Sequence, residues 1–256
     1  MIPTPIRQVL LTIQKHGVQA LLMGGQACVF YGAAQVSKDV DFVLLADDAN
    51  YKRLHLALAE LKAERIAIPR FDSAVLDRGH AVHFRCQASG VEGLRVDVMT
   101  KMREVAGFEA LWERRTTFGD DSGAEYHLLS VPDLVRAKKT QRSKDWPVIE
   151  LLVAIHCREN VESPTAEWIE FWLLESRTPE LIADLCHRFP AEAGALLVQR
   201  PLLTHAFAGE MDLLRAALDA EVRAEQARDR LYWEPLRQEM EVFRRQEREA
   251  GMAGSE

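Results

Sequence analysis

The chain has 256 residues, of which 48% are hydrophobic and 28% charged, with a net charge of −7; this is the composition of a water-soluble globular protein with room for one large or two ordinary domains. No stretch approaches the ~20 apolar residues of a membrane helix, the start lacks signal-peptide features, and four widely spaced cysteines form no Cys-x-x-Cys motif. We therefore expect a cytoplasmic protein with reduced thiols and no membrane partner.

Charge is distributed unevenly along the chain. Residues 1–157 carry 20 Lys and Arg against 19 Asp and Glu, a net of +1, whereas residues 158–256 carry 12 against 20, a net of −8. This change predicts two domains, one over 1–157 and one over 158–256. The acidic balance argues against a general nucleic-acid coat, but it leaves room for a local basic groove.

Helical and strand patterns alternate through the first part of the chain, which predicts an α/β (α+β) fold with a small mixed sheet flanked by helices. Gly17 ends the first predicted helix, and Ser130 with Pro132 marks the start of a later one. The predicted elements in chain order are a helix over 6–16, a strand over 18–23, a helix over 26–34, a strand over 38–45, a helix over 50–64, a short strand over 65–70, a strand pair over 80–87 and 94–101, a helix near 104–114, short strands between 115 and 129, and a helix over 130–157.

From residue 158 onward only helical patterns appear, so the C-terminal region is predicted to be all-helical. We expect Pro201 and Pro235 to separate helices, because proline lacks the N–H group that a helix interior needs. The predicted helices cover residues 164–176, 178–198 with a break at Pro190, 206–231 and 235–248.

Two aspartates in a predicted strand carry the first functional signal. Asp39 and Asp41 are two residues apart, so both side chains project from one face of the strand. Asp97 lies in another apolar strand, and three carboxylates on one half-buried sheet face need a compensating positive charge. Hard cations such as Mg²⁺ prefer carboxylate oxygens, and two such ions ~3.5–4 Å apart promote phosphoryl or nucleotidyl transfer. We therefore expect Asp39, Asp41 and Asp97 to bind Mg²⁺.

A glycine pair precedes these acids. A Gly24-Gly25 turn that leads into a helix would let backbone N–H groups approach phosphate oxygens closely. Each element is a weak signal by itself, because Gly-Gly and Asp-x-Asp both recur by chance. The spacing between them is more informative.

Gly24-Gly25, thirteen intervening residues and then Asp39-Val40-Asp41 resemble the signature of the polymerase-beta-like nucleotidyltransferase superfamily. The stretch from Gly32 to Asp41 resembles the minimal and AbiEii-type toxin nucleotidyltransferases of bacteria, which usually read Gly-x-x-Arg-x-Thr-x-Asp-x-Asp. Here Gln35 stands in the place of the arginine, and Ser37 replaces the threonine but keeps its hydroxyl. By the same resemblance, Asp97 matches the third metal-binding carboxylate.

Residues 133–146 carry a second part of this resemblance. AbiEii-like members have a helix with a lysine and, later, an Arg-x-Lys-Asp step, which Lys138 and Arg142-Ser143-Lys144-Asp145 match. In a continuous helix, positions 138, 142 and 145 would share one face. The resemblance implies that Lys138 and Arg142 meet a triphosphate and that Asp145 orients Lys138 or the acceptor. On pattern alone, a solvated salt-bridged face would be the favoured interpretation.

The leading hypothesis is an Mg²⁺-dependent enzyme, with two ions, that moves a nucleoside monophosphate from an NTP to an acceptor hydroxyl. Gly24, Gly25 and Ser37 would contact the phosphates, while Asp97 would share one ion and help to deprotonate the acceptor. The acceptor would be RNA or tRNA, a protein or a small molecule. The AbiEii resemblance favours a toxin–antitoxin setting with an antitoxin partner.

Two alternatives stay open. Gln35 and the acidic helical tail favour a nucleotidyltransferase-fold module that binds a nucleotide and a basic partner with weak or no catalysis. A metal-dependent glycosyltransferase also uses Asp-x-Asp, but it would need a larger domain before residue 39. His80 and His83 are interpreted as structural residues.

Overall fold

The computed structural model describes residues 3–253. Within this range the chain forms two compact units. Residues 3–29, 34–137 and 231–253 make up the first unit, and residues 30–33 and 138–230 make up the second. This division differs from the boundary predicted at 157/158, which falls inside a helix.

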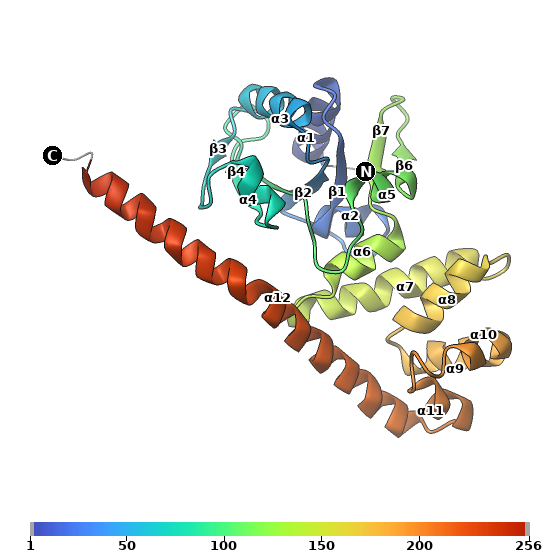
Figure 1. Ribbon diagram of the computed structural model, residues 1–256. Helices are drawn as coiled ribbons and strands as arrows, with labels where there is room; N and C mark the ends of the chain where they lie inside the picture. The colour runs from blue at the N-terminus through green and yellow to red at the C-terminus, as the bar shows by residue number, and fades with distance from the viewer. Residues whose placement is uncertain (1–2, 254–256) are drawn as a thin grey trace. The chain divides into compact units, whose positions relative to one another are not determined.

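A seven-stranded mixed sheet lies at the centre of the first unit, in the strand order β3-β4-β5-β2-β1-β7-β6 (Figure 1). The pairs β2–β5 and β1–β7 are parallel, and the other pairs are antiparallel. This arrangement confirms the predicted mixed α/β class. The strands are β1 (Ala20–Met23), β2 (Asp39–Leu44), β3 (Glu64–Arg65), β4 (Val82–Arg85), β5 (Arg95–Met99), β6 (Thr116–Gly119) and β7 (Glu125–Leu128).

Alternation along β2 and β5 separates the core from the candidate site. Val40 and Phe42 of β2, with Val96 and Val98 of β5, are at most 3% exposed. Because successive side chains of a strand point to opposite faces, the residues between them lie on the other face of the sheet. Burial of one face therefore fixes which side chains the other face presents.

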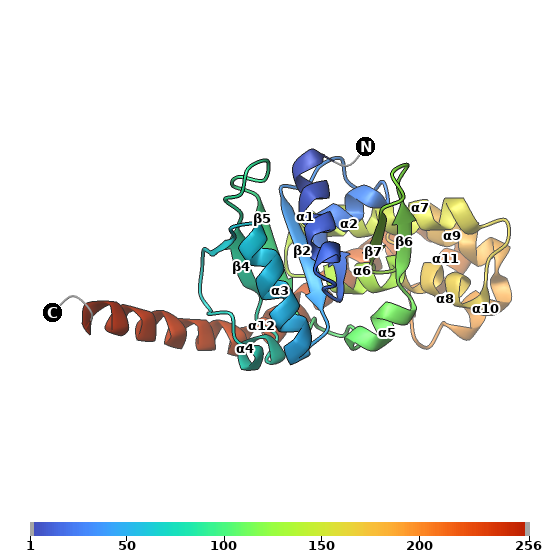
Figure 2. The ribbon, with the colours of Figure 1, turned by 90° about the horizontal axis from the view of Figure 1, so that it is seen from above.

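Helices α1 and α3 pack side by side against the sheet (Figure 2). The buried stripe of α1 includes Ile6, Val9 and Ile13, spaced at three and four residues as an amphipathic helix requires. A short helix that was not predicted, α4, begins at Ser73 and is capped by Asp72, whose side chain accepts a hydrogen bond from the Ala74 amide. The helices with residues in this unit are α1 (Thr4–Lys15), α2 (Gly24–Phe30), α3 (Asp48–Glu60), α4 (Ser73–Asp77), α5 (Phe108–Glu113), α6 (Val131–Lys138) and the last part of α12 (Met211–Ala253).

The second unit is helical, as predicted for the C-terminal region. Its core includes Trp172 and Leu203, both fully buried. The buried Arg200 guanidinium donates hydrogen bonds to the carbonyls of Leu173 and Ser176. The elements are the 3-10 helix η1 (Ser143–Asp145), α7 (Trp146–Asn160), α8 (Ala166–Glu175), α9 (Pro179–Arg188), α10 (Pro190–Ala195), α11 (Leu203–Ala208) and the first part of α12. The helix predicted over 206–231 is therefore divided between α11 and α12.

At two prolines the predicted helices are wrong. Helix α12 continues through Pro235, although proline removes the hydrogen bond to the Leu231 carbonyl and its ring crowds that carbonyl. The Leu231 side chain is 74% exposed, so that carbonyl lies on a side of the helix that water reaches. Conversely, the predicted helix over 130–157 is broken between α6 and α7. Pro147 stands in the first turn of α7, and its ring would clash with a helical carbonyl four residues earlier.

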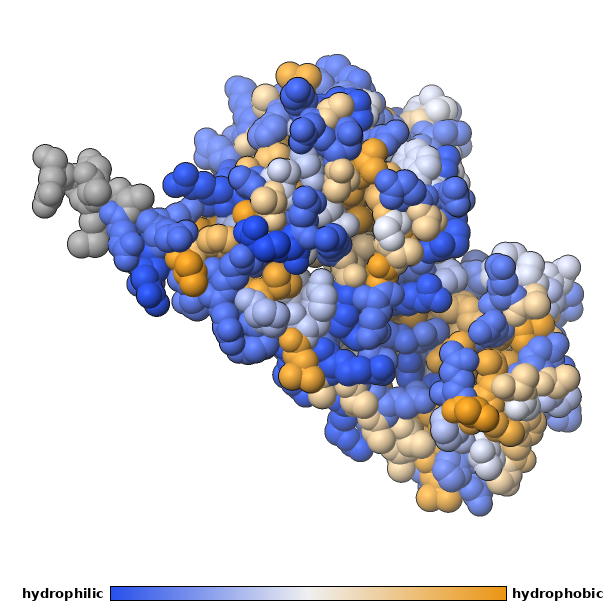
Figure 3. Space-filling view, viewed as in Figure 1, coloured by the Kyte–Doolittle hydropathy of each residue, from blue (hydrophilic) through white to orange (hydrophobic). Residues whose placement is uncertain are grey.

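Hydrophobic side chains are exposed over the second unit on the face drawn in Figure 3. Val198, Phe207 and Leu213 are among the large hydrophobic residues with exposed side chains. Between residues 3 and 253, no helix combines the length and the apolar character needed to cross a membrane.

Candidate functional site

The parallel pairing of β2 with β5 brings the predicted acids together. Asp41 lies directly beside Asp97, and Asp39 lies directly beside Arg95. Because partners in register on neighbouring strands project from the same face, the three aspartates and Arg95 share one face of the sheet. All three carboxylates are on partly exposed residues.

The glycine pair lies against this acidic face. Gly24 has φ +65°, and a Cβ atom on it would lie 2.5 Å from Asp41 Cγ and closer still to a carboxylate oxygen. A Cβ atom on Gly25 would lie 2.7 Å from the Ser37 hydroxyl, which donates a hydrogen bond of 3.0 Å to the Asp39 carbonyl. The predicted site residues Gly24, Gly25, Ser37, Asp39 and Asp41 therefore form one contiguous group.

Arg95 supplies a positive charge that was not predicted from the sequence. Its Nε atom donates a hydrogen bond of 2.7 Å to Asp97 Oδ1. This hydrogen bond raises the pKa of Arg95, and the charges of Asp39 and Asp41 act in the same direction. The signal was present in the sequence, because Arg95 precedes Asp97 by two residues and so projects from the same face of the strand.

His83 also contacts Asp97, so its interpretation as a purely structural residue was incomplete. In β4, His83 lies directly beside Asp97, with 2.9 Å between His83 Nδ1 and Asp97 Oδ1. Burial by itself would raise the pKa of Asp97, but hydrogen bonds from His83 and Arg95 outweigh it and lower that pKa. His80, in contrast, is buried against Glu239 of α12, 2.5 Å away, which fits a structural role.

The donor atoms of this face fit a divalent cation only in part. Asp39 and Asp41 offer the carboxylate oxygens that Mg²⁺ prefers. One oxygen of Asp97 is already held by Arg95 and His83. Among residues 3–253, no group of three or more His, Cys, Asp or Glu side chains is arranged to hold a metal ion. The two-ion centre of Asp39, Asp41 and Asp97 therefore stays a prediction.

The predicted cationic residues belong to the second unit, where they gather around Asp145. This carboxylate, 4% exposed, accepts hydrogen bonds from Arg142 Nε at 2.8 Å and from the Thr140 hydroxyl at 2.5 Å. Lys138 Nζ lies 3.7 Å from the other carboxylate oxygen. The single helical face predicted for these residues is wrong, because α6 ends at Lys138 and a turn leads to η1. A turn, rather than a helix, brings Lys138, Arg142 and Asp145 together.

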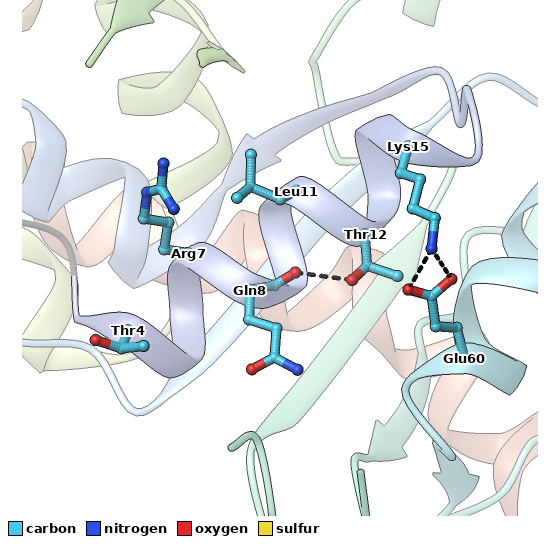
Figure 4. A pocket seen from close by; sticks show the side chains of 7 residues that line it. All are labelled: Thr4, Arg7, Gln8, Leu11, Thr12, Lys15 and Glu60. Atoms are coloured by element: carbon cyan, nitrogen blue, oxygen red, sulfur yellow. Dashed lines mark hydrogen bonds and ion pairs between the residues drawn. The ribbon is translucent and has the colours of Figure 1, made fainter. Parts of the chain in front are cut away.

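A groove of about 440 Å³ lies along α1 and is lined by none of the predicted site residues (Figure 4). Its cations are already paired, since Lys15 contacts Glu60 at 2.8 Å and Arg7 contacts Asp120 at 3.1 Å. Its lining residues are Thr4, Arg7, Gln8, Leu11, Thr12, Lys15 and Glu60.

Comparison with solved structures finds a distant structural likeness. No family model and no curated protein matches the chain. A crystal structure of a protein from H. pylori, described as a candidate nucleotidyltransferase, aligns with a TM-score of 0.40 and 13% sequence identity. The alignment covers 86% of this chain and 93% of that protein. A likeness at this level leaves the functional argument to the residues of the chain itself.

Proposed function

We propose that this chain is a nucleotidyltransferase, which moves a nucleoside monophosphate from an NTP to an acceptor hydroxyl and releases pyrophosphate. The observation that supports this most strongly is the close approach of the Asp41 carboxylate to Gly24, together with the position of Asp97 beside Asp41 on the next strand. A glycine is needed where backbone and carboxylate approach this closely. The same close approach would bring phosphate oxygens and carboxylate-bound cations to one place.

In this proposal Asp39 and Asp41 bind Mg²⁺, which would neutralise phosphate charge and polarise the bond that breaks. Backbone groups at Gly24 and Gly25 and the Ser37 hydroxyl would orient the triphosphate. Lys138 and Arg142 stay the predicted cationic residues for the triphosphate, and the buried Asp145 would orient Lys138, whose Nζ atom is 3.7 Å away. RNA, a protein or a small molecule would accept the nucleotide, and an antitoxin partner is part of the same proposal.

The test is label transfer from each α-³²P-NTP, with Mg²⁺ and either total RNA or total protein as acceptor. Replacing Asp39 and Asp41 together by Asn should abolish transfer, because both oxygen donors of the proposed cation lose their charge. The matched control replaces Asp121 and Asp219, which are exposed, so that two charges are again removed. Undiminished transfer in the Asp39→Asn, Asp41→Asn variant would refute the assignment.

A second candidate is a module that binds a nucleotide without catalysis. The engagement of Asp97 by Arg95 and His83 favours it, because a third catalytic carboxylate has to be available to the acceptor. Calorimetry separates the candidates: Mg²⁺-dependent NTP binding without pyrophosphate release in the presence of any acceptor fraction would support the module.

A further inference from the structure

The charge balance of the acidic face is the starting point. Asp39, Asp41 and Asp97 carry three negative charges, and Arg95, which contacts Asp97, carries one positive charge. Arg85 of β4 lies on the same face but is in register with Glu64 of β3, so these two charges offset each other. The remaining charge of about two matches a single divalent cation, since compensation of buried or half-buried charge requires near neutrality. When no nucleotide is bound, a second divalent cation would leave the face with an excess of positive charge.

The contact between Arg95 and Asp97 is more than an ordinary surface ion pair. Asp97 has a side-chain exposure of 14%, and Arg95 contacts it at 2.7 Å. Across the other edge of β5, Arg95 lies directly opposite Arg85 of β4. Two like charges opposite each other on neighbouring strands are destabilising. The attraction between Arg95 and the acids opposes this repulsion from Arg85.

We propose that the Arg95 guanidinium is a built-in counter-ion that takes the place of one divalent cation, so that the acidic face binds one ion rather than two. The inference rests on the proposed function in taking Asp39 and Asp41 as the ligands of that ion, and it revises the two-ion prediction. Arg95 acts as a positioning residue: it holds Asp97 and sets how many ions bind. Asp97 becomes a metal ligand only when Arg95 is removed.

The experiment is a Mn²⁺ titration of the full-length chain, with free Mn²⁺ measured by electron paramagnetic resonance. The wild type should bind one Mn²⁺ per chain, and Arg95→Gln should bind a second. Arg95→Lys, which keeps the positive charge, should bind one. Arg85→Gln is the matched control, because it removes one exposed charge from the facing position of the neighbouring strand, and it should also bind one.

A further variant tests where a second ion binds. Adding Asp97→Asn to Arg95→Gln should return the count to one, because the second ion depends on the released Asp97 carboxylate. Far-ultraviolet circular dichroism of each variant confirms that it is folded. Two ions bound by the wild type, or no gain in Arg95→Gln, would overturn this inference and leave the proposed function standing. Failure of both the wild type and Arg95→Gln to bind Mn²⁺ would instead overturn the metal ligands of the proposed function.

Discussion

Substitution of Gly24 by alanine should destabilise the protein through a contact at the centre of the candidate site. The backbone at this position has φ +65°, where an L-residue with a Cβ atom costs about 1–2 kcal/mol. The new Cβ atom would also lie 2.5 Å from Asp41 Cγ, so the Asp41 side chain must leave its rotamer at a further cost of about 0.5–1.5 kcal/mol. The expected loss in the free energy of unfolding is therefore about 1.5–3.5 kcal/mol.

Gly123→Ala separates the two contributions, because Gly123 has φ +82° and a Cβ atom added there would meet nothing within 4 Å. It should lose only the backbone part, about 1–2 kcal/mol. The assay is urea unfolding of the wild type and both variants at equal protein concentration. Equal losses for Gly24→Ala and Gly123→Ala would show that Asp41 does not crowd Gly24, and the close approach inferred for the site would be refuted.

Two further predictions concern the second unit. Arg200→Met should lower the free energy of unfolding by about 2–4 kcal/mol, because the carbonyls of Leu173 and Ser176 lose their buried donor. The control Arg215→Met, at an exposed position, should change that free energy by less than about 0.5 kcal/mol. Equal shifts of the melting temperature in the two variants would contradict this prediction. Burial lowers the pKa of His156 below its ordinary value of 6.5. As the pH drops below 6.5, His156 is therefore protonated in the unfolded chain before it is protonated in the folded protein. The free energy of unfolding should fall with a slope of at most about 1.4 kcal/mol per pH unit. His156→Asn, which keeps an acceptor for the Trp172 Nε1 donor, should lose that part of the pH dependence, and an unchanged slope would show that His156 is not its source.

Local sequence patterns were sufficient to predict much of the fold. Strand periodicity placed the hydrophobic residues of β2 and β5 in the core and the aspartates on the opposite face. Proline and capping residues located several helix ends, but they failed at Pro235, where a helix continues at an exposed position. A proline signal reports a lost hydrogen bond, and whether a helix tolerates that loss depends on the water and the packing around it.

The sequence by itself determined which acids could act together, because two-residue spacing assigns Asp39 and Asp41 to one face and the Gly24-Gly25 spacing ties them to a turn. Only the tertiary structure decided that Asp97 lies beside Asp41 and that Arg95 and His83 hold it. Strand pairing and register join residues more than fifty positions apart, and such long-range pairing leaves no trace in local periodicity. The shared face of Arg95 and Asp97 could be read from their two-residue spacing, but the placement of both beside Asp39 and Asp41 required the pairing of β2 with β5.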